Sequence, residues 1–129
     1  MRDRVEKTYY ENGQIEAEHY YINNRRHRIN GPAYTHYYNN GQIEAEYFYL
    51  NGKSHQENGP AIICYHKNGK IERKYYYLNG QCHREDGPAI IVYYKSGKVK
   101  SESWYEYGEE MDLLKEMVIR GLQMEFILM

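Results

Sequence analysis

The sequence repeats itself every 28 residues, and this repeat limits the possible folds more than any other feature. Residues 83–97 read His-Arg-Glu-Asp-Gly-Pro-Ala-Ile-Ile-Val-Tyr-Tyr-Lys-Ser-Gly, and near-copies occur twice upstream. The turn residues that recur without insertions are Asn12, Gly13, Gly31, Pro32, Asn40, Gly41, Gly59, Pro60, Asn68, Gly69, Gly87, Pro88 and Gly97. A fixed period with glycine at constant offsets indicates one supersecondary unit used repeatedly. The unit has the length of two strands with two turns and is short for two helices.

Each Asn-Gly pair lies between runs rich in Tyr and Ile, which predicts a β-hairpin with a two-residue type I′ turn. Such a turn at residues 40–41 places Tyr38 opposite Ile43 and, further along, Tyr34 opposite Tyr47. These residues share the less charged face of the sheet, and we expect this face to be the better covered one. A slip of one residue would exchange the two faces.

A second turn follows each long strand, at residues 23–24, 51–52, 79–80 and 107–108. The same pairing rule places one histidine of each unit opposite an aromatic residue: His27 opposite Tyr20, His55 opposite Phe48 and His83 opposite Tyr76. We therefore predict that the three histidines stack on aromatic rings. The Asn-Gly-Pro or Asp-Gly-Pro that follows predicts a bend that redirects the chain into the next strand.

The two ends of the chain differ from the middle. We expect a repeat array over residues 1–108 and a separate C-terminal segment over residues 109–129. Residues 109–120 have the apolar spacing of an amphipathic helix, with Gly121 as its C-cap. Residues 122–129 fit either a closing strand or a continuation of the helix. The candidate interface residues of this segment are Met111, Leu114, Met117, Val118, Phe126 and Leu128.

This C-terminal segment has two possible roles. It could cap the last hairpin and cover an edge that would otherwise recruit other strands. It could also dock a protein or join two copies as a homodimer, because it carries more apolar surface than a short cap requires.

Composition excludes several classes of function. The 129 residues include 17 Lys and Arg and 18 Asp and Glu, so the net charge of −1 provides no basic surface for nucleic acid. Cys64 and Cys82 lack the spacing of a metal or redox motif, which favours two free thiols in a reducing compartment. No apolar run reaches the length of a membrane span, and residues 1–7 are charged. We expect an intracellular or virion protein without a cleaved signal peptide.

The repeat unit is most complete over residues 65–91, which read Tyr-His-Lys-Asn-Gly-Lys-Ile and end with His-Arg-Glu-Asp-Gly-Pro-Ala-Ile-Ile. This unit resembles the MORN-like repeat proteins, and in particular the His-Arg-x-Asp-Gly-Pro-Ala variant of large DNA viruses of amoebae, phages and bacteria. The resemblance covers about residues 5–108. It implies an elongated, twisted antiparallel sheet that serves as a scaffold or protein-binding surface, and some bacterial relatives are antitoxin components.

Three catalytic or ligand-binding interpretations can be weighed against structural ones. Equivalent strands lie about 9.5 Å apart, so one zinc ion with ligands at about 2 Å cannot bridge the histidine series. Glu16 and Glu18, like Glu44 and Glu46, are expected on one strand face at a separation of about 7 Å, but later units replace one of each pair by lysine. Tyrosine rows could bind sugars, although cross-strand ladders that hold a thin sheet together are far commoner.

We therefore expect an all-β, elongated, twisted antiparallel sheet of tandem β-hairpins with a short C-terminal helix and tail. The expected function is a non-enzymatic scaffold or protein–protein interaction module without a cofactor. The favoured setting is a large virus, as a structural or virion-associated protein. An antitoxin-like protein binder and a glycan-binding domain are the alternatives.

Overall fold

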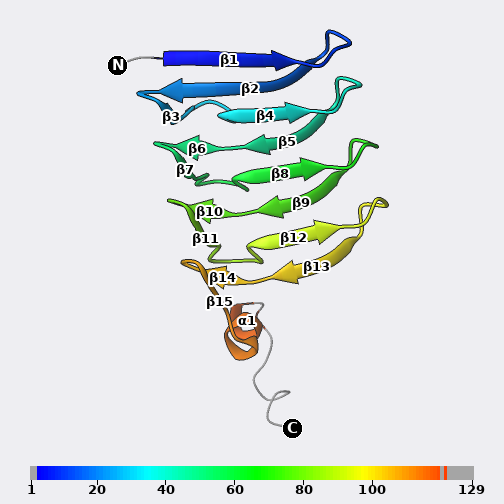
Figure 1. Ribbon diagram of the computed structural model, residues 1–129. Helices are drawn as coiled ribbons and strands as arrows, with labels where there is room; N and C mark the ends of the chain where they lie inside the picture. Colours follow the sequence, from blue (N-terminus) through cyan, green and yellow to red (C-terminus); the bar gives the residue numbers. More distant parts are fainter. Residues whose placement is uncertain (1–2, 120, 122–129) are drawn as a thin grey trace.

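The computed structural model describes residues 3–119 and residue 121, and the sheet that it contains is a single layer of hairpins stacked in chain order (Figure 1). The main strands are β1 (Asp3–Tyr9), β2 (Ile15–Ile22), β4 (Tyr34–Tyr37), β5 (Ile43–Tyr47), β8 (Ile62–Tyr65), β9 (Ile71–Tyr75), β12 (Ile90–Tyr93) and β13 (Val99–Ser103). Each is antiparallel to its neighbours, and the predicted fold class is confirmed.

Short strands extend each hairpin at its second turn. They are β3 (Arg25–Arg26), β6 (Tyr49–Leu50), β7 (Lys53–Ser54), β10 (Tyr77–Leu78), β11 (Gln81–Cys82), β14 (Tyr105–Glu106) and β15 (Glu109–Glu110). β3 pairs with the end of β2, and the other six form the two-stranded ladders β6–β7, β10–β11 and β14–β15. In Figure 1 these ladders lie along the side of the sheet opposite the Asn-Gly turns.

The predicted type I′ conformation is wrong for the Asn-Gly turns and right for the second turns. At Asn40-Gly41 only the glycine has a positive φ, 92°. Its amide donates to the carbonyl of Tyr38 (3.0 Å), while the amide of Tyr38 donates to the carbonyl of Gln42 (2.7 Å). This is a three-residue loop, a type I turn followed by a left-handed glycine. The reason lies in Asn40, whose Oδ1 accepts from the amide of Gln42 at 2.9 Å and holds an Asx turn.

The longer loop changes the register near the turn and nowhere else. Ile43 pairs with Tyr37, and not with Tyr38 as predicted, whereas Tyr34 still pairs with Tyr47. A bulge at Glu44 on the second strand compensates for the extra loop residue on the first, so the pairing beyond it is unchanged. The same irregularity occurs in every main hairpin.

The second turns have two consecutive residues with positive φ, as a type I′ turn requires. Asn51 and Gly52 have φ values of 51° and 79°, and Tyr107 and Gly108 have values of 46° and 84°. Asparagine is the non-glycine residue that adopts this region most readily, so Tyr107 departs from the repeat at a position where tyrosine is unfavourable.

The two broad faces of the sheet differ in burial, and the better covered face is not the one that we expected. We call one the alanine face, after Ala33, Ala61 and Ala89, all fully buried. We call the other the tyrosine face, after Tyr34, Tyr47 and Tyr75, which are half-buried. The alanine face is the better covered one, because the segments between second turn and Gly-Pro fold their own side chains over it.

The C-terminal segment begins differently from the prediction of a helix over residues 109–120. Glu109 and Glu110 form β15, which pairs with β14 and completes the fourth second-turn hairpin. The helix α1 (Leu113–Ile119) starts after Asp112, whose Oδ1 accepts from the amide of Lys115 at 2.8 Å. Gly121 follows with a φ of 76° and ends the helix as predicted. Residues 122–129, including Phe126 and Leu128, lie outside the described residues.

Candidate interaction surface

The three predicted histidines each hold two successive units together. The amide of Asn51 donates to Nδ1 of His27 at 2.9 Å, and that of Asn79 donates to Nδ1 of His55 at 3.0 Å. The amide of Tyr107 donates to Nδ1 of His83 at 2.9 Å. Because Nδ1 accepts in each case, the neutral ring carries its proton on Nε2. The histidines are therefore links between units, at the start of the next second turn.

The predicted stacking of each histidine on the opposite aromatic takes a different form. His83 does stack on a ring, but on that of Tyr107 in the next unit, with centroids 4.1 Å apart. The ring of Tyr76, across the hairpin, is covered by the guanidinium of Arg84, 4.1 Å from its centroid. Arg28 lies over Tyr20 in the same way, at 4.0 Å. The arginine after the histidine is thus the residue that covers the aromatic ring.

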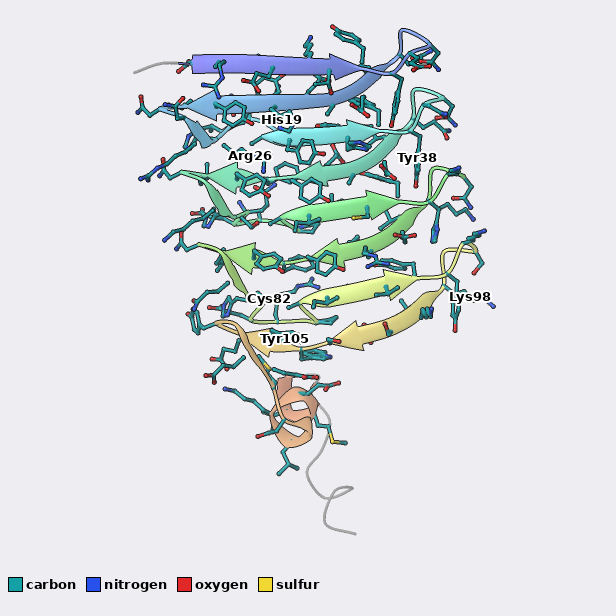
Figure 2. The ribbon with its side chains drawn as sticks, viewed as in Figure 1. His19, Arg26, Tyr38, Cys82, Lys98 and Tyr105 are labelled. Carbon is teal, nitrogen blue, oxygen red and sulfur yellow. The ribbon has the colours of Figure 1, made fainter. Side chains whose placement is uncertain are left out.

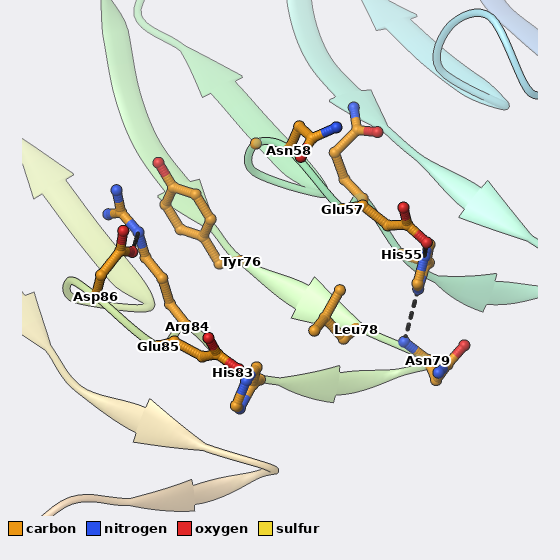
Figure 3. Close-up of a pocket in the computed structure, with 12 residues that line it drawn as sticks. His55, Glu57, Asn58, Tyr76, Leu78, Asn79, His83, Arg84, Glu85 and Asp86 are labelled. Carbon is orange, nitrogen blue, oxygen red and sulfur yellow. Dashed lines mark hydrogen bonds and ion pairs between the residues drawn. The ribbon is translucent and has the colours of Figure 1, made fainter.

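The arginine also explains the glycine of Gly-Pro. Nη1 of Arg84 donates to the carbonyl of Pro88 at 3.1 Å, which folds the side chain back over its own loop (Figure 3). A Cβ atom on Gly87 would stand 2.8 Å from Cζ of Arg84. In the second unit Gln56 replaces the arginine, and a Cβ on Gly59 would meet nothing closer than Cγ of Gln56 at 3.8 Å.

The carboxylate pairs that could have suggested catalysis are separated by the bulge. Glu44 contacts Nδ1 of His36 at 2.5 Å, whereas Glu46 accepts from the hydroxyl of Tyr65 at 2.6 Å. His36 is two residues from Tyr34 and therefore lies on the tyrosine face. Tyr65 is four residues from Ala61 and therefore lies on the alanine face. The expectation that Glu44 and Glu46 share a face is therefore wrong. The bulge turns the first carboxylate of each pair onto the tyrosine face.

The described part of the chain contains no group of three or more His, Cys, Asp or Glu side chains arranged to hold a metal ion. Within the same residues no helix is long and apolar enough to span a membrane. Cys64 and Cys82 are free thiols, and burial raises the pKa of both, that of Cys82 to about 11. Thiols with raised pKa values are poor nucleophiles at neutral pH.

The tyrosine face carries a continuous row of aromatic rings. His19 stacks on Tyr34 with centroids 4.4 Å apart, and Tyr34 stacks on Tyr47 at 5.0 Å. Tyr21 lies 6.0 Å from His19, and Tyr49 lies 6.5 Å from Tyr47. In the described chain no helix or second sheet covers this row (Figures 1 and 2).

Arginine side chains lie against the aromatic row. The guanidinium of Arg26 is 5.2 Å from the centroid of Tyr34 and 5.7 Å from that of Tyr49, and Figure 2 shows Arg26 beside His19. Nη1 of Arg73 donates to the hydroxyl of Tyr75 at 3.1 Å. Burial and the charge of Arg26 lower the pKa of His19, so its ring is neutral at pH 7.

Two polar atoms of this row are buried without a hydrogen-bond partner in the described structure, Nδ1 of His19 and Nε of Arg26. Next to them is a shallow groove of about 620 Å³. Its lining includes Tyr34, Tyr47, Ile62, Arg73 and Tyr75. The face therefore combines rigid rings, aliphatic surface and arginine side chains, a combination that protein–protein contacts favour.

A second groove, of about 740 Å³, lies between two loops on the alanine face (Figure 3). It is bounded by His55, Tyr76, His83 and Arg84, residues that already hold the units together. Its floor is thus occupied by the structural contacts described above.

Sequence reasoning missed the two arginines of the tyrosine face, although a signal for them exists. Arg26 stands where the later units have Ser54 and Cys82, and Arg73 stands where Ala45 occurs in the second unit. Both are departures from the repeat. Positions that vary between units therefore indicate the individual surface of the protein, while the constant ones build the sheet.

The candidate interface residues of the C-terminal segment are only partly exposed. Leu114 and Val118 are 49% and 58% exposed, while Met111 and Met117 are half-buried. A side-chain ion pair between Lys115 and Glu106 joins α1 to the last hairpin. The helix thus lies at the end of the array with an apolar stripe in solvent.

Equivalent hairpins, equivalent turns and a histidine link between successive units define this protein as a tandem β-hairpin repeat protein. Residues 5–23, 33–51 and 62–79 match the family model described as MORN repeat variant. The chain therefore carries MORN-variant repeats over residues 5–79, and such repeats are generally non-catalytic scaffolds for protein interaction. No curated protein and no solved structure matches the chain. The hairpin β12–β13 continues the same geometry beyond the matched residues.

Proposed function

We propose that the protein is a scaffold that binds a protein partner through its tyrosine face. The observation that carries the proposal is the uncovered row of stacked rings from His19 through Tyr34 to Tyr47, flanked by Arg26. Tyrosine and arginine dominate the energetics of protein interfaces, because they bury large surfaces at a small cost in conformational entropy.

The architecture supports this role through rigidity. Histidine links and paired strands fix each unit relative to the next, so the rings are held in position before any partner arrives. Preorganised contacts bind more tightly than flexible ones because little freedom is lost on association.

We further propose that the C-terminal segment provides a second contact, with another copy of the chain. The exposure of Leu114 and Val118 on α1 supports it. A variant carrying Leu114→Ser and Val118→Ser tests this contact by light scattering. A fall in mass relative to the unchanged protein would support it, and an unchanged mass would exclude it.

One observation favours the alternative of a glycan-binding domain. The tyrosine face is uncovered, and exposed tyrosine rings also stack on sugar rings. A glycan array with the unchanged protein and the Tyr47→Ala variant separates the two functions. Strong binding that disappears in the variant would overturn the protein scaffold.

The partner can be captured from host extract on the immobilised full-length protein. We expect a protein that is retained by the unchanged chain and lost from Tyr47→Ala. Its identity then distinguishes a virion component from a toxin, the two settings that the resemblance suggests. Tyr93→Ala is the matched control, because it removes a half-buried tyrosine from the alanine face.

A further inference from the structure

The N-terminal strand β1 forms an open edge of the sheet. All seven residues from Asp3 to Tyr9 are exposed, and the strand pairs only with β2 among the described elements. In Figure 1 it is the outermost strand, at the opposite end of the array from α1. An edge of this length offers a row of backbone N–H and C=O groups to another extended strand.

The charges along β1 are arranged antisymmetrically about Val5: residues at equal distances on either side of it carry opposite charges. The sequence Asp3-Arg4-Val5-Glu6-Lys7 reads negative, positive, neutral, negative, positive. If two copies of β1 lie antiparallel with their Val5 residues opposite, Arg4 of each copy faces Glu6 of the other. Asp3 likewise faces Lys7, so that every charged residue of the segment meets an opposite charge across the strands.

The neighbouring registers do not have this property. A shift that centres the pair between Val5 and Glu6 brings Arg4 opposite Lys7. A shift that centres it on Glu6 brings two glutamates together, and one centred on Arg4 brings two arginines together. Like charges directly opposite one another destabilise a strand pair, so the register centred on Val5 is favoured over these three.

The side chains of this segment lie on both faces. Arg4 and Glu6 pair with Tyr21 and His19 of β2, which places them on the tyrosine face. Their side chains already contact one another within the chain, with Nε of Arg4 2.9 Å from Oε1 of Glu6. Both are half exposed there and can reach a facing strand. Asp3, Val5 and Lys7 lie on the alanine face.

We propose that β1 pairs antiparallel with β1 of a second copy, with Val5 opposite Val5. The twofold axis then passes through the sheet at Val5, and the tyrosine faces of the two copies become one continuous surface. The occupant of this edge is a second copy because the charge pattern is complementary to the strand itself. This contact is separate from the proposed partner-binding role of the tyrosine face.

A different self-contact, head to tail, would continue the repeat from one copy into the next. Extending the pairing of β9 with β12 by one unit places Lys7 of one copy opposite Glu102 of another, and Thr8 opposite Ser101. That contact has one ion pair where the twofold contact has four. It would also build open chains and no closed dimer.

Sedimentation equilibrium of the full chain tests the proposal. The variant with Leu114→Ser and Val118→Ser, which lacks the proposed C-terminal contact, should reach the mass of two chains and no more. Arg4→Glu places glutamates opposite one another, and Glu6→Arg places arginines opposite one another, so each variant should dimerise at least about tenfold more weakly. The double variant Arg4→Glu with Glu6→Arg restores both attractions and should dimerise like the unchanged protein.

Mixing the two single variants gives the sharpest result. Each copy of one then complements each copy of the other, so an equimolar mixture should form heterodimers although neither variant dimerises alone. A mere loss of folding cannot be rescued by mixing. Lys100→Glu on β13 is the control for a change of charge at the other edge and should leave the dimer unchanged.

Several results would overturn the proposal. A monomeric unchanged protein, single variants that remain dimeric, or a mixture without heterodimers would each do so. A dimer that depends on Leu114 and Val118 and not on Arg4 would assign self-association to the C-terminal segment. Growth beyond two chains that Glu102→Lys abolishes would establish the head-to-tail contact instead.

Discussion

The backbone amide of Tyr107 donates a hydrogen bond to Nδ1 of His83 across 2.9 Å, and this contact joins the fourth second turn to the unit before it. His83 is only 3% exposed, so the bond is shielded from water. The same link recurs at His27 and His55, which makes it the repeated joint of the array.

Replacing His83 by alanine should weaken the array at this joint. The variant leaves the amide of Tyr107 without its acceptor and removes the stacked ring, so we expect a loss of about 1–3 kcal/mol in the free energy of unfolding. Urea unfolding measures the loss. His27→Ala, at a half-buried position, should cost less, and Tyr107→Asn, which keeps the amide, should cost little. Equal losses at His27 and His83 would contradict the role of burial.

The glycines of Gly-Pro should differ in their tolerance of alanine. Gly87→Ala pushes Arg84 away from Tyr76 and from the carbonyl of Pro88, and should cost about 1 kcal/mol. Gly59→Ala, beside Gln56, should change stability by less than about 0.5 kcal/mol. Thermal unfolding of both variants provides the comparison. In an Arg84→Gln background the cost at Gly87 should largely disappear, and a cost that persists there would refute the explanation.

The fourth Asn-Gly-type turn can be improved by following the repeat. Oγ of Ser96 is 3.4 Å from the amide of Lys98, whereas Oδ1 of Asn68 is 2.9 Å from the equivalent amide of Lys70. Ser96→Asn should therefore close the Asx turn and raise the free energy of unfolding by about 0.5–1 kcal/mol. The reverse change, Asn68→Ser, should lower it by a similar amount. An unchanged free energy of unfolding in Ser96→Asn would show that the serine already satisfies the amide of Lys98.

The thiol of Cys82 should react slowly until the solution is strongly alkaline. Burial raises its pKa from 9.0 to about 11, so little thiolate exists at pH 8. We expect the rate of alkylation of the folded Cys64→Ser variant to rise with pH up to about 11, and unfolding in urea to accelerate it at pH 8. Fast labelling of folded protein at pH 8 would contradict this environment.

The same shift predicts how stability depends on pH. The folded state favours the protonated thiol, so its contribution is complete below the pKa of the unfolded chain. It is lost as the pH rises from about 9 towards 11. The urea midpoint of the unchanged protein should fall over this range more than that of Cys82→Ala.

Much of the architecture follows from the sequence because the repeat fixes it. The 28-residue period determines the number of hairpins, and the pairing of Tyr34 with Tyr47 follows from alternation. The conformation of the Asn-Gly turn does not follow, because Asn40 Oδ1 competes for the amide of Gln42 and favours a longer loop. The bulge at Glu44 is a consequence of that loop, and it separates the carboxylates that alternation had placed together.

The candidate surface was harder to predict than the sheet. Which face is covered depends on how the segment after each second turn folds, and the contact of Arg84 with Tyr76 is not visible in the spacing of the residues. The importance of Arg26 and Arg73 comes from their neighbours in space. Only their departure from the repeat marks them in the sequence.

The central claim is that the tyrosine face binds a protein, and calorimetric titration with the captured partner tests it most directly. Tyr47→Ala and Arg26→Ala should each weaken binding at least about tenfold, since they remove a ring and a cation of the type that dominates interfaces. Tyr93→Ala, on the alanine face, should bind like the unchanged protein. Binding that is lost with Tyr93→Ala and retained with the other two would contradict the account.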